Sequence, residues 1–408
     1  MKVFLPAIAE YIPEQMAQCL ATFLDFCYLV RQNDFTEDTI KQVQEAIDRF
    51  HALRVVFIET GIREGFLMPR MHAMMHYPLL IMQFGALNGV CSSITESRHI
   101  TAVKRPWQRS NQNNALSQIL LTNRRNDKLA ALRSLLAERG LIPPIHTSSQ
   151  AKLFERDDLD EGPDESGECD SERLQAEVVL AKSKARHLAP NVKYPHNLKQ
   201  LVDSLHQRDL PLLARRFLYE QLHDDSSENI PLTSLPDIRS KIEVFHSAVA
   251  RFFAPSDTVG IRGMHREQIR SCPLYHGKPR YDMVSIVIDD GKKGFLGMSA
   301  ARVLLFFSFK HKHNGKDNEY PCALVHWFDT YGRSRDAATG MWQVRPGFLD
   351  MAKRQPHLAV IYLHAIFRSV HLIPVYGKEM VPNVLKYWKS LDLYRAFYVN
   401  FSALRCPL

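Results

Sequence analysis

Residues 301–331, ARVLLFFSFKHKHNGKDNEYPCALVHWFDTY, decide the fold class of the carboxyl-terminal half of the chain. Two apolar segments rich in aromatic and β-branched side chains flank a polar stretch that contains an Asn-Gly pair. This composition is typical of strands separated by a turn. Similar short segments recur after residue 240, among them YDMVSIVID, GMWQVRP, LAVIYLHAI and HLIPVYG. The pattern predicts a small antiparallel β-barrel or sandwich over residues 240–395.

The amino-terminal part of the chain has helical rather than strand periodicity. MAQCLATFLDFCYLVRQ and TEDTIKQVQEAIDRFHALRVVFIET place apolar residues three to four positions apart, and the second starts at Thr36 and stops before Gly61. A third helix is expected over His72 and His76, and a fourth is expected to start near Ser93. NALSQILLTNRRNDKLAALRSLLAERG predicts a fifth.

An acidic run separates this helical part from the rest. FERDDLDEGPDESGECDSE, residues 154–172, holds ten acidic residues against one arginine and shows no apolar periodicity, so it is expected to be a disordered, solvated linker. Beyond it, LQAEVVLAKSKARHL and NLKQLVDSLHQRDLPLLARRFLYEQL predict further helices. The expected α+β layout is a helical segment over 1–148, an acidic linker over 149–175, a helical connector over 176–239, a β-rich domain over 240–395 and a tail over 396–408.

Composition narrows the class of protein. The 408 residues are 45% hydrophobic and 24% charged, which is typical of a globular chain, and the net charge of +8 is a mild excess. The sequence has seven cysteines but no CxxC pair, so it does not predict a self-contained zinc ribbon. No run of 18 apolar residues occurs, and the apolar start is too short for a secretory signal. The expectation is an intracellular protein without a membrane partner.

The stretch MPRMHAMMHYPLLIMQF, residues 68–84, carries a candidate metal site. His72 and His76 are four positions apart, a spacing that places two imidazoles on one face of a helix and lets them hold one zinc ion. Zinc needs about two more ligands, which this motif does not supply. The alternative is that both histidines are ordinary helix residues beside the methionines of this stretch.

Glu96 and the residues after it form a second candidate site. Glu96 fits either a capping box in Ser93-Ile94-Thr95-Glu96 or a metal-binding carboxylate of a two-metal site for phosphodiester cleavage. Basic residues and one aromatic residue follow: Arg98, Lys104, Arg105, Trp107, Arg109, Arg124, Arg125 and Lys128. Cations interleaved with an aromatic ring suit a phosphate backbone, and the alternative is a solvated basic face.

Several runs resemble one known family. LDFCYLVRQNDF, DRFHALRVVFIETGIREGF, GALNGVCSSITESRHITAVKRPWQRSN and LLTNRRNDKLAALR resemble the carboxyl-terminal part of Plavaka transposases of mushroom-forming fungi, which are similar to the CACTA, Mirage and Chapaev group. LLARRFLYEQL, IEVFHSAVARFFAPSDTVGIRGMHREQIR, ARVLLFFSF, YPCALVHWF, TGMWQV and HLIPVYG resemble the tail that follows the catalytic core of the same family. The resemblance covers nearly the whole chain.

The resemblance implies a cut-and-paste DNA transposase with an RNase H-like core. Two aspartates and a final glutamate bind Mg²⁺ there, and a CxxC together with an HxxxH holds Zn²⁺. Glu96 matches the final glutamate, and His72 and His76 match the histidine half of the zinc site. Pro78 departs from a continuous helix through this pair. The upstream strands, both aspartates and the CxxC have no counterpart here, so the expectation is a carboxyl-terminal fragment that is inactive alone.

The resemblance also implies binding partners and a location, and two other classes of protein are alternatives to a transposase. The expected partners are DNA and a full-length transposase that supplies the missing aspartates, and the expected location is the nucleus. A different class is a non-catalytic nucleic-acid or chromatin-binding protein that works through aromatic residues of the β-domain: Phe306, Phe307, Phe309, Trp327 and Trp342. Those aromatics fit the core of a barrel better than a ligand cage. A third alternative is a helical interaction module without a ligand.

Overall fold

The structure is a computed structural model. It describes residues 4–139 and 176–400, apart from short gaps at 33, 67, 88–98, 186, 190–191, 206, 224–229, 254–263, 290, 293, 314, 333, 379–380 and 382–384. The chain forms two compact units: residues 1–86 together with 173–408, and residues 87–172. The acidic run and the expected helix start near Ser93 lie outside the described residues.

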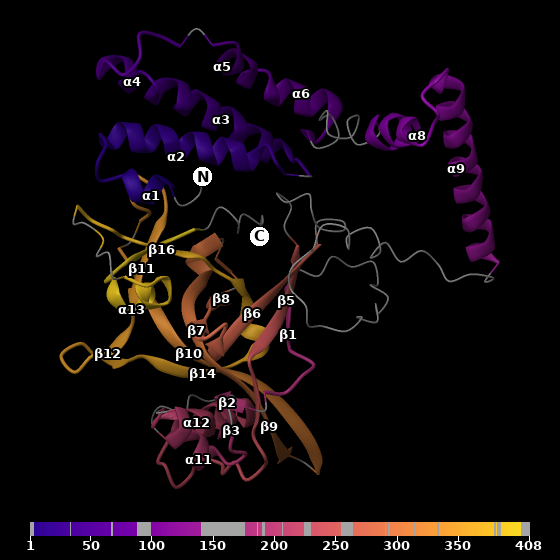
Figure 1. The fold of residues 1–408 in the computed structure, drawn as a ribbon. Coiled ribbons are helices and arrows are strands. Elements are labelled where there is room, and N and C mark those ends of the chain that lie inside the picture. Colours follow the sequence, from indigo (N-terminus) through magenta and orange to yellow (C-terminus); the bar gives the residue numbers. More distant parts are fainter. Residues whose placement is uncertain are drawn as a thin grey trace. The chain divides into compact units, whose positions relative to one another are not determined.

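The amino-terminal part of the first unit is helical, as the sequence predicts (Figure 1). Its helices are α1 (Phe4–Ile8), α2 (Glu14–Leu29), α3 (Glu37–Leu53), α4 (Val56–Glu59), α5 (Pro69–Met74) and α6 (Tyr77–Phe84). Thr36 caps α3, because its hydroxyl accepts the backbone N–H of Thr39 at 3.2 Å and Thr39 returns a bond. The expected start at Thr36 is therefore confirmed.

The prediction of one helix over both histidines is wrong. His72 lies in α5, whereas His76 is the residue that caps α6. Pro78 stands at the start of α6, where a missing N–H costs nothing, but in a continuous helix it would remove the bond to the carbonyl of residue 74. The chain resolves this conflict by ending one helix and starting another.

The segment expected as a helical connector begins with a strand. β1 (Ala176–Leu180) pairs with β5 (Ser247–Phe253), so the prediction of a helix over LQAEVVLAKSKARHL is wrong. Neighbouring valines favour the strand, and β5 supplies a partner that the local sequence does not reveal. β2 (His187–Ala189) and β3 (Val192–Lys193) follow as a small ribbon. The helices α11 (Leu198–Leu205) and α12 (Leu210–Leu222) confirm the second half of the prediction.

The carboxyl-terminal part is an antiparallel sheet curled as a half-barrel (Figure 1). Its path runs β15-β8-β9-β10-β11-β17-β16, with β14 also paired to β10 and β4 to β9. Its strands are β4 (Glu243–Phe245), β8 (Met283–Val287), β9 (Met298–His313), β10 (Lys316–Tyr331), β11 (Trp342–Pro346), β14 (Leu358–Tyr362), β15 (Ile366–Ser369), β16 (Leu372–Pro374) and β17 (Phe397–Val399). The predicted strand segments are confirmed, and the predicted tail over 396–408 contains β17.

A second sheet and two helices cover the two faces of this curled sheet. The second sheet has the order β1-β5-β6-β7, with β6 (Met264–Tyr275) and β7 (Lys278–Tyr281). Phe307 and Phe309 of β9 pack with α11 and α12, whereas Phe306, one position out of phase, packs with Ala248 of β5 and Ile269 of β6. The alternation of side chains along β9 therefore builds two cores on opposite faces.

Short elements complete the first unit. They are the ribbon of β12 (Phe348–Asp350) and β13 (Gln355–Pro356), the 3₁₀ turns η3 (Gly294–Gly297), η4 (Leu363–Ala365) and η5 (Tyr387–Lys389), and α13 (Ser390–Leu393). β8 pairs with β9 around η3, as expected of the segments YDMVSIVID and ARVLLFFSFKH. Among the described residues, no helix is long and apolar enough to span a bilayer.

The second unit is helical in its described part. It consists of a π-helix, η2 (Ile100–Lys104), followed by α8 (Arg105–Gln108) and α9 (Ala115–Glu138). The amide of Asn123 in α9 donates to the carbonyl of Ala102 in η2 at 2.8 Å, and Pro106 and Ile119 are buried. The expected fifth helix is confirmed as α9.

Candidate functional site

The histidine pair is brought together at the junction of α5 and α6. The Nε2 atoms of His72 and His76 lie 3.2 Å apart, and the two rings meet edge to face with centroids 4.8 Å apart. Both side chains are exposed. The break between the helices therefore does not separate them, because a single turn still joins the backbone N–H of Met75 to the carbonyl of His72.

The environment of the pair distinguishes it from the neighbouring methionines. Met74 is buried among Phe26, Phe50 and other core residues of α2 and α3, and Met71 packs against that core. The imidazoles point away from this core and contact each other. Burial in this core therefore applies to Met71 and Met74, whereas the two histidines are exposed like Met75, which is 55% exposed.

The distance between the two nitrogens suits a shared metal ion. Two ligands about 2.0–2.1 Å from one zinc ion at a tetrahedral angle lie about 3.3–3.4 Å apart, close to the 3.2 Å observed. The same distance also fits a hydrogen bond in which one neutral ring donates to the other. No group of three or more histidine, cysteine, aspartate or glutamate side chains that could hold a metal occurs among the described residues. The pair is therefore half of a zinc site at most within them.

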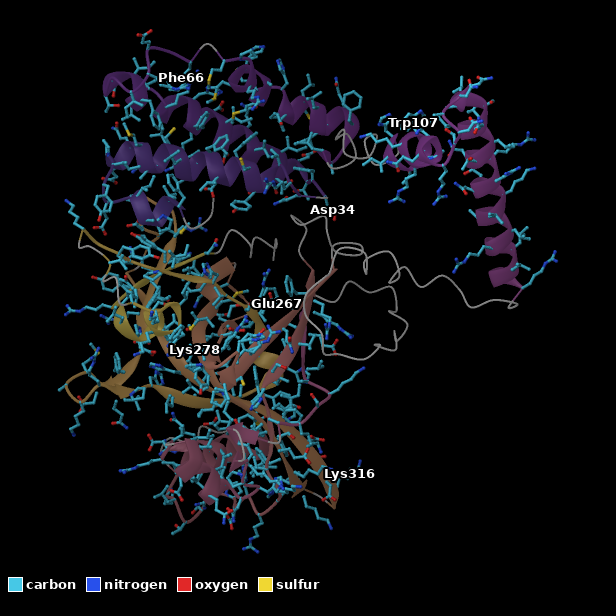
Figure 2. All side chains as sticks on the ribbon, viewed as in Figure 1. Asp34, Phe66, Trp107, Glu267, Lys278 and Lys316 are labelled. Atoms are coloured by element: carbon cyan, nitrogen blue, oxygen red, sulfur yellow. The ribbon has the colours of Figure 1, made fainter. Side chains whose placement is uncertain are left out.

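The second candidate site is a basic helical surface in the other unit. Lys104, Arg105, Arg109, Arg124, Arg125 and Lys128 are all exposed. Figure 2 shows Trp107 on α8, and its side chain is 45% exposed. Within the described part of the chain, none of these cations makes an ion pair. The surface thus offers exposed positive charge, offset in part by Asp127 of α9, and an accessible aromatic ring.

Two predicted site residues lie outside the described residues. These are Glu96, the expected metal-binding carboxylate, and Arg98, the first of the expected basic residues. The roles predicted for them stay predictions. The structure describes no carboxylate cluster beside the histidine pair in their place.

The aromatic residues of the β-domain are core residues. Phe306, Phe307 and Phe309 are at most 1% exposed, Trp342 is buried in a cluster with Phe295 and Phe397, and Trp327 packs against the core that contains Phe306. No ligand can reach the phenylalanines without unfolding the sheet. The preference for a core over a ligand cage is confirmed.

Burial shifts the pKa of two histidines and one cysteine in the β-domain. Burial lowers the pKa of His326, whose Nε2 donates to the carbonyl of Gly347 at 2.9 Å, and lowers the pKa of His246, which bonds the hydroxyl of Tyr194 at 3.1 Å. Burial also raises the pKa of the Cys322 thiol. Each group has its partner inside the fold, so none of them is poised for chemistry.

A cluster of arginines on the four-stranded sheet was not singled out by the sequence analysis. Arg251, Arg266, Arg270 and Arg280 come from three neighbouring strands. The run HREQIR has two arginines four positions apart with a glutamine midway between them, and this period of two is the signal that could have indicated one polar face of a strand. Comparison of the chain with protein-family models, curated proteins and solved structures gives no match.

Proposed function

We propose that the chain acts as the carboxyl-terminal part of a cut-and-paste DNA transposase of the Plavaka type. The observation that carries the proposal is the exposed pair of imidazoles whose Nε2 atoms lie 3.2 Å apart. The resemblance of the sequence assigns half of a zinc site to the same two residues, His72 and His76. The 3.2 Å between the two nitrogens supports this assignment, because two ligands of one tetrahedral zinc ion lie at nearly that distance from each other.

In this proposal the chain contributes parts of two metal sites. His72 and His76 would hold zinc together with cysteines from upstream sequence, which would fix α5 and α6 against an RNase H-like core. Glu96, together with two upstream aspartates, would hold magnesium ions, which would supply Lewis acidity for phosphodiester cleavage. The residues of this chain would provide one carboxylate and the cations that hold the DNA.

DNA binding is assigned to α8 and α9. Arg124 and Lys128 lie one helical turn apart, Arg125 flanks them, and Trp107 is exposed on α8. Lysine and arginine that neutralise phosphates release counterions, so binding should weaken steeply with salt. A nuclear location belongs to the same proposal.

The first experiment measures binding of the full chain to a labelled DNA duplex by fluorescence anisotropy at several salt concentrations. The variant Arg124→Glu/Arg125→Glu/Lys128→Glu should lose at least tenfold in affinity and about 2.7 in the slope of log K against log salt, from about 0.9 per phosphate. The matched control, Lys310→Glu/Lys312→Glu/Lys316→Glu at the end of the β9–β10 hairpin, changes the net charge equally. Equal losses in both variants would remove the assignment to α9.

A second candidate is a non-catalytic nucleic-acid-binding protein derived from a transposase. It is favoured by the histidine pair having no third ligand among the described residues. Zinc and magnesium content, together with DNA cleavage, should be measured on residues 1–408 and on a chain extended upstream. Metal and cleavage in the extended chain alone would support the transposase. If both chains bind DNA but neither holds metal or cleaves DNA, the result would support the non-catalytic protein.

A further inference from the structure

Trp107 on α8 differs from the other three tryptophans of the chain because its ring is uncovered. Trp342 is 7% exposed, and Trp327 packs against a buried cluster of the β-domain. The ammonium group of Lys278 lies 4.6 Å from the centroid of the Trp388 ring. The side chain of Trp107 is 45% exposed (Figure 2) and, within the part of the chain that the structure describes, makes no hydrogen bond, ring contact or cation–π contact. Its indole is therefore available to a partner.

The backbone on either side of Trp107 is held by side-chain hydrogen bonds. Pro106 is buried and has no N–H to give to the carbonyl of Ala102, four residues earlier. The side-chain amide of Asn123 in α9 donates to that carbonyl at 2.8 Å. The hydroxyl of Ser110 donates to the carbonyl of Trp107 itself at 2.7 Å. Because this backbone is already ordered, binding through the indole costs little additional entropy.

The loop between α8 and α9 is fixed in the same way. The side-chain oxygen of Gln118 accepts the backbone N–H of Asn111 at 3.2 Å, and its amide donates to the carbonyl of Asn113 at 3.0 Å. Gln112 and Asn114 have φ angles of 61° and 53°, in the left-handed region that residues other than glycine rarely adopt. The loop therefore has a specific backbone conformation, which holds the indole in a constant position relative to the cations of α9.

The charge around the ring suits a polyanion. Residues 99–128 hold six cations and one carboxylate, that of Asp127. All six cations are exposed: Lys104, Arg105, Arg109, Arg124, Arg125 and Lys128. Lys104 lies three residues before Trp107 and therefore on the same side of the helix, and Val103 beside it is 39% exposed. A purely apolar partner would leave the cations without counter-charges, whereas a nucleic acid offers both phosphates and aromatic bases.

We propose that Trp107 stacks on an unpaired base of DNA, while the cations of α8 and α9 bind the phosphates of the adjoining duplex. The inference rests on the proposed DNA binding and adds the kind of DNA, a duplex continued by unpaired nucleotides. Bases inside a duplex are stacked on each other and offer no free face to an indole, whereas an unpaired base does. One stacked base contributes about fivefold or more to affinity, with little dependence on sequence, because every base has a π-face.

The test uses the full chain and two labelled 20-base-pair duplexes, each with a single-stranded extension of four nucleotides. One extension has its bases, and the other consists of abasic sites, which keep the phosphates and remove the bases. The chain should bind the first duplex at least fivefold more tightly, and Trp107→Ala should remove this preference. Trp107→Phe should keep part of it, because a phenyl ring still stacks. Tyr11→Ala, which removes a 62% exposed aromatic side chain from the other unit, is the control and should change neither affinity.

Fluorescence separates stacking from an indirect effect on folding. The extension with bases should quench the indole emission of the original chain but not that of Trp107→Phe, whose remaining tryptophans are covered. Equal affinity for the two extensions, or an equal loss on both in Trp107→Ala, would overturn the proposal. Quenching by neither DNA would also overturn it and would assign the indole to a protein contact.

The same probes distinguish failure of this inference from failure of the proposed DNA binding. Arg124→Glu/Arg125→Glu/Lys128→Glu should weaken both duplexes alike, because it removes phosphate contacts. If it weakens neither, while Trp107→Ala still removes the preference for bases, stacking is supported and binding by α9 is wrong. If the chain binds neither duplex, both proposals are wrong.

Discussion

The β9–β10 hairpin and helix α9 both contain many large apolar side chains but differ in how far they bury them. Leu305, Phe306 and Phe307 of β9 are at most 3% exposed, whereas Leu116, Leu129 and Leu132 of α9 are between 51% and 68% exposed. The hairpin is thus stabilised by cores on both of its faces. Within the described part of its unit, α9 is held mainly by its own backbone hydrogen bonds and a few contacts to η2 and α8.

This difference teaches where stability and binding are to be sought. A fully buried sheet leaves little freedom for its inner side chains to recognise a ligand, which is why the aromatic residues of β9 have no such role. A helix with exposed leucines and exposed cations provides a surface on which a partner can bind. The functional residues of this protein are therefore expected on its least buried elements.

The largest effect should come from truncating a core residue of β9. Phe306→Ala removes a side chain that is 0% exposed and should lower the free energy of unfolding by about 3–5 kcal/mol, measured by urea unfolding with near-ultraviolet circular dichroism. Leu129→Ala on α9, where the side chain is 63% exposed, should change it by no more than about 0.5 kcal/mol. Similar losses in both variants would break the comparison.

A smaller effect is expected where backbones approach each other closely. A Cβ at Gly297, just before β9, would collide with the carbonyl oxygens of Asp289 and Lys292. Gly297→Ala should therefore cost about 1–3 kcal/mol, because the loop must shift. Gly65→Ala is the control, since a Cβ there meets nothing within 4 Å. A neutral Gly297→Ala would show that the loop before β9 is more adaptable than its contacts suggest.

The smallest effect is expected from the half-buried His326 of β10, which should make the free energy of unfolding depend on pH. Burial lowers the pKa of His326 in the folded protein, so below the ordinary histidine pKa of about 6.5 the unfolded chain binds more protons. Stability from this residue is present above that pH and is lost as the pH falls toward the folded pKa. His326→Gln still offers an N–H to Gly347 but takes up no proton, so it should reduce the slope of unfolding free energy between pH 7 and pH 5. An unchanged slope would assign the effect to other groups, such as His246.

The strands that could be predicted from the sequence are those rich in aromatic and β-branched residues. The aromatic and β-branched runs of β9 and β10 leave no other interpretation, and Thr36 marks the start of α3 because its hydroxyl can cap only a helix beginning there. The strand β6 was not predicted because Arg266, Gln268 and Arg270 occupy alternate positions and resemble a polar helix or loop, and the short strand β5 was not predicted either, although its sequence SAVARFF is mostly apolar. β1 was missed because its partner lies about seventy residues further along the chain.

The candidate site was predictable in part for similar reasons. A spacing of four residues predicts that His72 and His76 share a face, and the structure brings their nitrogens together. The sequence indicated Pro78 as a departure without showing that a helix would end between the histidines. The arginines of β5, β6 and β7 come together only through the register of these three strands, which depends on turns and cores far from each arginine.

Strand β17 has a consequence for how the protein is made. Its residues pair with β11 on one side and β16 on the other, and Phe397 and Val399 are fully buried. A ribosome needs roughly 3–14 s to add the residues from the end of β10 to β17, whereas a hairpin forms in about 1–10 µs. The edge of the sheet at β11 therefore stays unpaired until β17 has been synthesised. Aggregation and chaperone binding during synthesis should concentrate in that interval, and a chain stopped before Phe397 should need a chaperone throughout its life.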